Sequence, residues 1–222
     1  MGSFVALTKS EAAYQELRAR ILDGRLAPGA RVSTEALAED LNISTTPLRE
    51  AVRRLAADYL LEAPPHREIL IPPLTTQRLQ EIYELRLILD PLAAGKATTQ
   101  ARDEDVRAVR GLLEAARAAQ PAEWLAANRR FHRGIYSRCG NQILVRALDT
   151  LTDRSDRYLQ VLSRGVATVA RADKDHDAIM DAFAGGKPRE VEALVREHLR
   201  TSLDYLVSAL AASSADANGA VK

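Results

Sequence analysis

The chain has 222 residues, of which 46% are hydrophobic, 27% charged and only 5% aromatic. This length supports one large or two small hydrophobic cores, and the composition excludes a disordered or collagen-like chain. The 31 lysines and arginines balance 30 aspartates and glutamates, so any affinity for nucleic acid must come from local placement of charge. Cys139 has no partner for a disulfide, and neither a membrane span nor a signal peptide is evident. We therefore expect a cytoplasmic protein without membrane association.

Proline and glycine residues interrupt mainly the first third of the chain, and this distribution predicts a domain boundary at the end of that third. Six of the nine prolines precede Thr75, where the expected elements are short, whereas long amphipathic helices follow. The sequence predicts two domains, residues 1–73 and 74–211, and a flexible tail over residues 212–222.

The first domain reads as three helices and a hairpin. Ser10 is expected to cap a helix that closes at Gly24, and Ser33 a second helix. A third helix, with Pro47 in its first turn, runs to about Tyr59. Residues 60–62 and 69–71 are expected to form two short strands around a proline-rich turn. This order is typical of a winged helix-turn-helix domain.

The short turn at Asn42 to Ser44 projects the third helix away from the domain, so that it can enter a major groove. Thr45, Thr46 and Arg49 lie in its N-terminal half, and Arg53 follows one turn after Arg49 on the same face. Arg49 is suited to the O6 and N7 atoms of guanine, a contact that discriminates by about 1 to 3 kcal/mol.

Other polar groups of this domain suit the DNA backbone. The hydroxyl groups of Ser44 and Thr46 fit phosphate oxygens, and His66 and Arg67 at the hairpin tip are expected at the minor groove or backbone. The opposing interpretation is a solvated helix face, because residues 1–73 carry nine basic and ten acidic residues.

The run from Ile21 to Leu61 resembles the DNA-binding domain of the GntR family of bacterial regulators. It carries the motifs "G-x-L-x-P-G", "L-A-x-x-L" and "S-x-T-P-L-R-E-A" in register. The resemblance implies that DNA is contacted by six residues: Arg31, Ser44, Thr46, Arg49, His66 and Arg67. Thr45 replaces the arginine usual in the family, and Glu68 replaces the usual glycine of the wing.

The second domain offers six amphipathic helices, predicted over residues 76–99, 103–119, 122–138, 142–163, 166–184 and 188–210. Their apolar stripes predict an antiparallel bundle, and the whole protein is therefore expected to be mainly α-helical. The interior of such a bundle can present ligands to a metal or a small molecule.

Three histidines, His132, His176 and His198, lie in apolar stripes of three different predicted helices. Asn128 lies one helical turn before His132, so both can reach one ion. Three imidazoles suit a divalent metal, with zinc or nickel the first candidates. The alternative is that each histidine is an ordinary core residue, and the aspartates around His176, including Asp175, are interpreted as a solvated face.

Arg86 lies in an apolar stripe with Tyr83, and an inward guanidinium needs an anion. Asp90, four residues later, is one candidate partner.

Residues 78–210 resemble the FCD type of effector domain of FadR-like GntR regulators, through ELRLILDPLAA, NRRFHRGIYSRCGN and the spacing of His176 and His198. The resemblance implies that an aspartate and three histidines hold a divalent metal, with Asn128 here in place of the aspartate. It further implies that Arg86 binds the carboxylate of a small organic-acid effector and that Tyr83 lines the same pocket.

Together these features predict a DNA-binding transcription regulator rather than an enzyme. We expect a repressor that binds a pseudo-palindromic operator as a homodimer, because two heads related by a dyad read more sequence than one. One alternative makes the metal itself the signal. Another is a metal-dependent hydrolase, which would need a general base that no carboxylate convincingly supplies.

Overall fold

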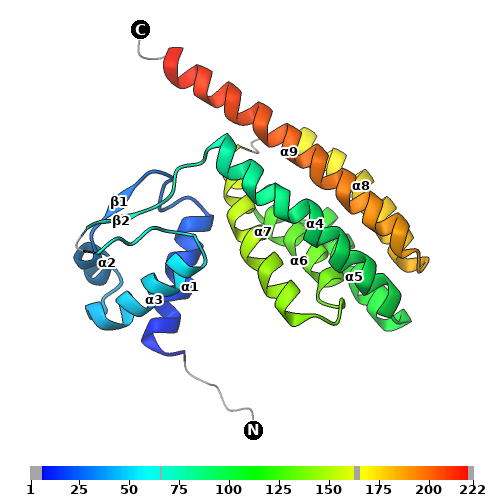
Figure 1. Cartoon of the computed structure of the whole chain (residues 1–222), viewed down its shortest axis with the longest axis horizontal. Coiled ribbons are helices and arrows are strands. Elements are labelled where there is room, and N and C mark those ends of the chain that lie inside the picture. The colour runs from blue at the N-terminus through cyan, green and yellow to red at the C-terminus, as the bar shows by residue number, and fades with distance from the viewer. Residues whose placement is uncertain (1–6, 66, 163–165, 220–222) are drawn as a thin grey trace. The chain divides into compact units, whose positions relative to one another are not determined.

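The computed structural model describes residues 7–65, 67–162 and 166–219. The chain divides into two compact units, one ending at Leu74 and the other beginning at Thr75, one residue beyond the predicted boundary (Figure 1). The described residues form nine helices and one two-stranded sheet. The expectation of a mainly α-helical protein is confirmed.

The first unit contains three helices and two strands: α1 (Lys9–Leu22), β1 (Arg31–Val32), α2 (Thr34–Asp40), α3 (Thr45–Ala57) and β2 (Ile69–Leu70). Thr8, rather than Ser10, caps α1, because its side chain accepts a hydrogen bond from the Glu11 amide at 3.1 Å. The predicted cap Ser33 does accept from the Ala36 amide, at 3.1 Å. Apolar side chains of all three helices and of β2 form the core of this unit.

The wing differs from the predicted hairpin in its pairing. β2 pairs antiparallel with β1, a strand that the sequence analysis missed, in the register Arg31 to Leu70. The expected strand at residues 60–62 contributes only an isolated bridge between Glu62 and Leu70. Pro64 and Pro65 follow directly and lack backbone N–H groups, so the ladder cannot extend toward the tip.

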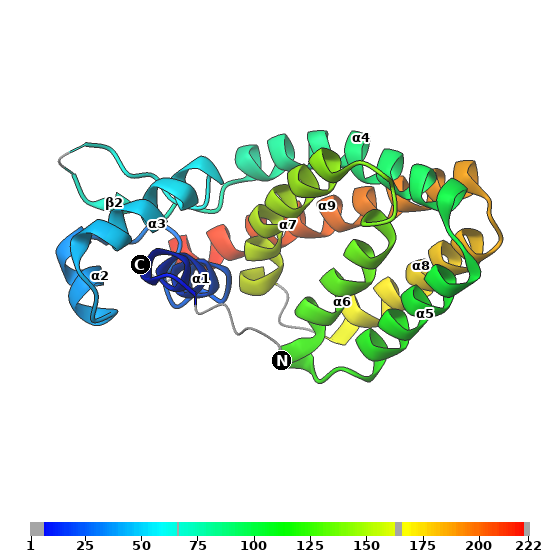
Figure 2. The same ribbon diagram turned by 90° about the horizontal axis from the view of Figure 1, so that it is seen from below.

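The second unit is a bundle of six helices: α4 (Thr76–Gln100), α5 (Asp103–Ala118), α6 (Pro121–Tyr136), α7 (Gln142–Leu162), α8 (Val166–Ala184) and α9 (Pro188–Gly219). α4 and α9 lie side by side along their lengths (Figures 1 and 2). In the part of the chain that the structure describes, no helix combines the length and hydropathy needed to cross a bilayer.

The structure continues helical backbone into the segment, residues 212–222, that the sequence predicts as a flexible tail. α9 continues without a break to Gly219. Residues 211–218 contain neither proline nor glycine, so no helix-breaking residue precedes Gly219. The rest of the tail lies outside the described residues.

Candidate functional site

The third helix of the first unit, α3, has the two faces that a recognition helix needs. Its inner face buries Leu48, Ala51, Val52 and Leu55, which anchor it to the core. Asn42 in the preceding turn has a φ of 50°, a left-handed conformation that asparagine tolerates better than most residues. The outer face exposes the side chains of Thr45, Thr46, Arg49 and Arg53.

The arginines of this unit fall into two groups. Arg20, Arg25 and Arg54 form ion pairs with nearby carboxylates, among them Arg54 with Glu11 at 2.6 Å. The exposed candidates for DNA contact form no ion pair with any described residue: Arg31, Arg49, Arg53 and Arg67. Four guanidinium groups on this surface are therefore open to an external anion, and phosphate is a strong candidate.

The N-terminus of α3 offers uncharged hydrogen-bond donors for a phosphate. Ser44 is the N-cap residue, but its side chain makes no capping hydrogen bond, so the exposed hydroxyl is not committed to the helix. The first amides of a helix carry partial positive charge and favour anions. His66, the other wing residue predicted to touch DNA, lies outside the described residues.

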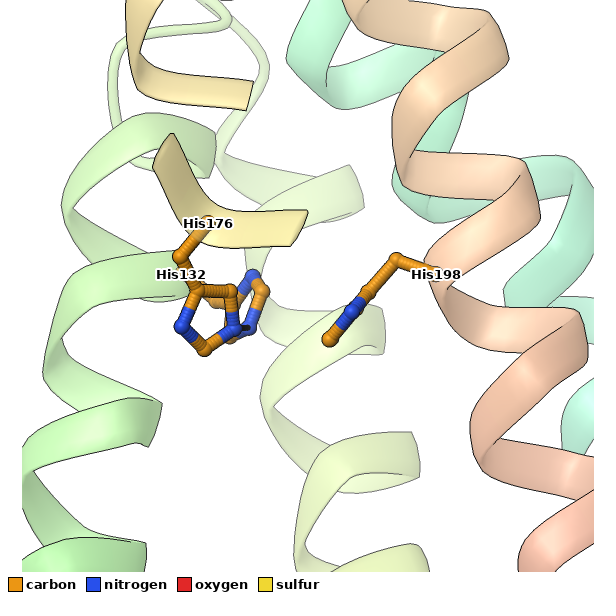
Figure 3. Close-up of side chains that lie close together, drawn as sticks. All are labelled: His132, His176 and His198. Atoms are coloured by element: carbon orange, nitrogen blue, oxygen red, sulfur yellow. Dashed lines mark hydrogen bonds between the residues drawn. The ribbon is translucent and has the colours of Figure 1, made fainter. Parts of the chain in front are cut away.

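The structure brings together the three histidines predicted to bind a metal. His132 from α6, His176 from α8 and His198 from α9 point toward one another (Figure 3). The His132 and His176 Nε2 atoms are 3.1 Å apart, and one ring nitrogen of each histidine lies within 4.8 Å of the others. Ring centroids are separated by 4.9 to 5.2 Å.

Burial keeps two of these imidazoles, His132 and His176, neutral. It lowers the pKa of His132 well below its usual value, with the neighbouring His176 and His198 acting in the same direction. Burial likewise lowers the pKa of His176 to about 3. A neutral imidazole presents a nitrogen lone pair, which is the form that coordinates a metal.

Two further polar atoms fit a divalent cation in this cluster. The Asn128 Oδ1 atom lines the same cavity as His132 and is buried without a hydrogen-bond partner among the described residues. Asp175 Oδ2 lies 3.1 Å from His198 Nδ1, which leaves the Nε2 atom of that ring for the cluster. Three imidazoles and an amide oxygen form a neutral donor set that suits zinc or nickel.

Asp175 is a residue that the sequence analysis placed wrongly on a solvated face. It is half-buried and contacts His198 across α8 and α9. Its partner lies on α9, so its position next to His176 in the sequence gave no signal of this contact, although metal-binding histidines are commonly held by a carboxylate.

Arg86 of α4 is buried and already has partners. It donates to Asp90 Oδ2 at 2.9 Å and to Ser155 Oγ at 2.8 Å, so the pairing that its spacing suggested is present. Burial opposes its charge, but Asp90 outweighs burial and the pKa of Arg86 is raised. Its Nε atom is buried without a partner among the described residues. The buried Tyr83 ring lies beside it, 5.3 Å from the guanidinium carbon.

A cavity of about 300 Å³ connects these groups inside the bundle. Its walls include Asn128, His132 and His198 together with Arg86 and Tyr83, so the predicted metal and effector residues border one space. This volume is at the lower end of the range for small-molecule sites.

Comparison with known proteins assigns both units. Residues 9–71 match the bacterial regulatory proteins of the gntR family, and residues 81–201 match the FCD domain. The chain belongs to the GntR family. This GntR protein is 31% identical to the probable D-xylose utilization operon transcriptional repressor of Paenarthrobacter nicotinovorans, over 90% of its own length and 86% of that protein. It is also 31% identical to the transcriptional regulator McbR of Escherichia coli (strain K12), over 68% and 70% of the two chains.

The fold of this GntR protein also matches a solved relative. The structure of E. coli McbR/YncC superposes with a TM-score of 0.80 and 25% identity, covering 91% of this chain and 99% of that one. The predicted membership in the GntR family, with an FCD domain, is confirmed. Its relatives are transcriptional regulators and not enzymes, so the hydrolase alternative is set aside.

Proposed function

We propose that this GntR-family regulator represses transcription by binding a pseudo-palindromic operator as a homodimer, and that a small organic acid bound beside a divalent metal releases it. The observation that carries this proposal is the convergence of three histidines, two of which border a cavity, in a chain that also carries a DNA-binding head. Operator binding places the regulator in the cytoplasm of a bacterium.

The head reads DNA through α3 and the wing. Arg49 and Arg53, with Thr45, face the bases of the major groove. The groups that hold the backbone are Ser44, Thr46, Arg31, His66 and Arg67. The support for this division is the exposure of the described members and the lack of ion pairs among their arginines. Phosphate contacts fix the register, and base contacts supply the specificity.

The bundle holds the metal and the effector. His132, His176, His198 and Asn128 would ligate the ion, and Asp175 would orient His198. When bound, a divalent ion supplies positive charge and open positions for a carboxylate oxygen. Arg86 would contribute its buried Nε–H to the same acid.

A second copy of the chain is supported by an apolar stripe on α4. Leu85, Ile88 and Leu92 are 48%, 61% and 46% exposed and follow one another at helical spacing. Three large apolar side chains on one exposed face are typical of a helix that packs against a partner. A dyad through such a contact would pair two heads for two half-sites.

The head is tested on DNA selected from a random-sequence pool by the full-length chain. Arg49→Ala should lose about 1 to 3 kcal/mol of discrimination between selected and random DNA. Arg25→Ala is the matched control, because Arg25 already pairs with Asp23 and Glu16. Unchanged discrimination by Arg49→Ala would refute the proposed docking of α3.

The receptor half is tested separately with His132→Gln, which keeps a polar side chain of similar size. Zinc affinity, measured by calorimetry, should fall at least about tenfold, while DNA binding in a chelating buffer should stay unchanged. Equal zinc affinity in the two proteins would contradict the metal site without touching the DNA-binding assignment.

One observation favours a second reading, in which the metal alone is the signal. The Arg86 guanidinium is already paired with Asp90, so it does not require an acid for charge balance. Under that reading zinc by itself would release the selected DNA, whereas the proposed function requires an added organic acid.

A further inference from the structure

The charged side chains around the cavity balance one another. Arg133 pairs with Asp149 at 2.8 Å, and Arg129 pairs with Asp153 and, at 3.4 Å, with Asp156. Arg86 pairs with Asp90 on its own helix. Every arginine known to border the cavity therefore has a carboxylate partner, and the cavity offers no row of free cations to a polyanion.

These ion pairs also fix the order of residues along the cavity. Arg133 of α6 pairs with Asp149 of α7, and Arg129, one turn earlier on α6, pairs with Asp153, one turn later on α7. The two helices are therefore antiparallel, so that Trp124 near the start of α6 lies toward Leu159 near the end of α7. Ser155, which accepts from Arg86, lies level with Arg129. Asn128 consequently lies between the histidine cluster and the end formed by Trp124 and Leu159. Arg86 lies beside the cluster, because it contacts Ser155 on one side and Asp90, the partner of Tyr136, on the other.

The end of the cavity beyond Asn128 is formed by the Trp124 ring and the Leu159 side chain, and its one buried donor without a partner among the described residues is the Trp124 indole N–H. Trp124 and Leu159 both border the cavity, and Trp124 lies eight residues, or about 12 Å along α6, from His132. Val145, which also borders the cavity, lies at the opposite end, close to Tyr136. A ligand whose charged group sits at the histidine cluster therefore extends its body along an apolar wall.

From this arrangement we propose that the effector is a monocarboxylic acid with an apolar or aryl body, and not a polycarboxylate. The inference rests on the proposed function, which places an acid at the histidine cluster. The carboxylate lies between the cluster and Arg86, whose Nε–H is a buried donor without a partner among the described residues. The body lies between Trp124 and Leu159. A second or third carboxylate would have to displace an existing ion pair.

The cavity volume limits the size of this acid. About 300 Å³ corresponds to roughly ten molecules of liquid water, which suits an acid of the size of 3-phenylpropionate. Trp124 is the only tryptophan of the chain, so its emission reports ligand binding at the apolar end directly.

The experiment titrates zinc-loaded full-length protein, cleared of free zinc, with three probes: 3-phenylpropionate, its neutral amide and propane-1,2,3-tricarboxylate. Calorimetry measures affinity, and Trp124 emission shows where the probe binds. We expect 3-phenylpropionate to bind at least about tenfold more tightly than either other probe and to change the emission.

Variants at the two ends of the cavity provide the matched comparison. Leu159→Ala should weaken 3-phenylpropionate by about tenfold, and Trp124→Leu should weaken it when binding is followed by calorimetry. Val145→Ala should leave the affinity within about twofold, because it changes the opposite end. Circular dichroism on each variant separates a lost contact from a lost fold.

The possible outcomes are distinct. Tighter binding of the tricarboxylate, no binding of 3-phenylpropionate, or equal effects of Leu159→Ala and Val145→Ala would each overturn the inference. A protein that fails to take up zinc would instead contradict the metal site of the proposed function, and the three probes would then be ranked on the metal-free chain by the same criteria.

Discussion

The loss of stability of the metal-free protein on acidification reports the burial of the histidine cluster. His176 is 1% exposed, and burial lowers its pKa from 6.5 to about 3. Between these two values the unfolded chain binds the proton more readily than the folded chain, so the free energy of unfolding falls as the pH falls. From pH 7 to pH 5 the titrating interval is about 1.5 units, and at about 1.36 kcal/mol per unit His176 alone costs about 2 kcal/mol. His132, whose pKa is lowered in the same direction, adds to this loss.

The assay is urea unfolding in a chelating buffer at pH 7 and pH 5. Trp124 emission follows the bundle alone, because the head contains no tryptophan. His176→Gln cannot take up the proton, so its loss of stability between the two pH values should be smaller than that of the parent by about 2 kcal/mol. Asp175 and Arg117, the charged neighbours of His176, are present in both proteins. Equal pH dependence in the two proteins would refute the conclusion that His176 is buried as a neutral imidazole.

Three further predictions concern the bundle. Asp175→Asn should weaken zinc binding about 10- to 100-fold, because the carboxylate that orients His198 is lost; calorimetry showing no change would place Asp175 outside the metal site. Asn128→Asp should raise zinc affinity at least about tenfold by adding a charged ligand, measured by competition with a chelator, and weaker binding would contradict ligation at this position. Leu85→Glu should shift the protein toward monomer in sedimentation equilibrium, whereas Ile143→Glu, at a residue 82% exposed, should leave the distribution unchanged. A dimer that survives Leu85→Glu would move the interface away from α4.

The bundle helices could be predicted closely because their signals are local. Pro121 begins α6 and Pro188 begins α9, at the first helical position, where proline is favoured. Between such start signals the apolar periodicity marks the length of each helix. The histidine cluster was also predictable, since each ring lies in an apolar stripe and stripes face inward in a bundle.

The wing was less predictable because its pairing is not local. β1 and β2 are two residues each and lie almost forty residues apart, so no alternation within either segment marks them as partners. Pro64 and Pro65 suggested a hairpin, yet the same prolines stop the ladder that a hairpin needs.

The side-chain partners at the site could not be predicted from the sequence either. Arg86 had two candidate partners in the sequence. The structure shows that Asp90 and Ser155 hold it, while its Nε–H has no partner among the described residues. Asp175 differs from a solvated aspartate only in its contact with His198 on another helix, which spacing within α8 does not reveal.

One helix, α4, follows the head, lines the cavity and carries an exposed apolar face. It begins at Thr76, and its N-cap, Thr75, directly follows Leu74, the last residue of the head. One flank of the helix presents Tyr83 and Arg86 to the cavity. The opposite flank presents Leu85 and Ile88 outward. One rigid helix therefore carries both a wall of the cavity and an exposed apolar face, and it is the first helix after the DNA-binding unit.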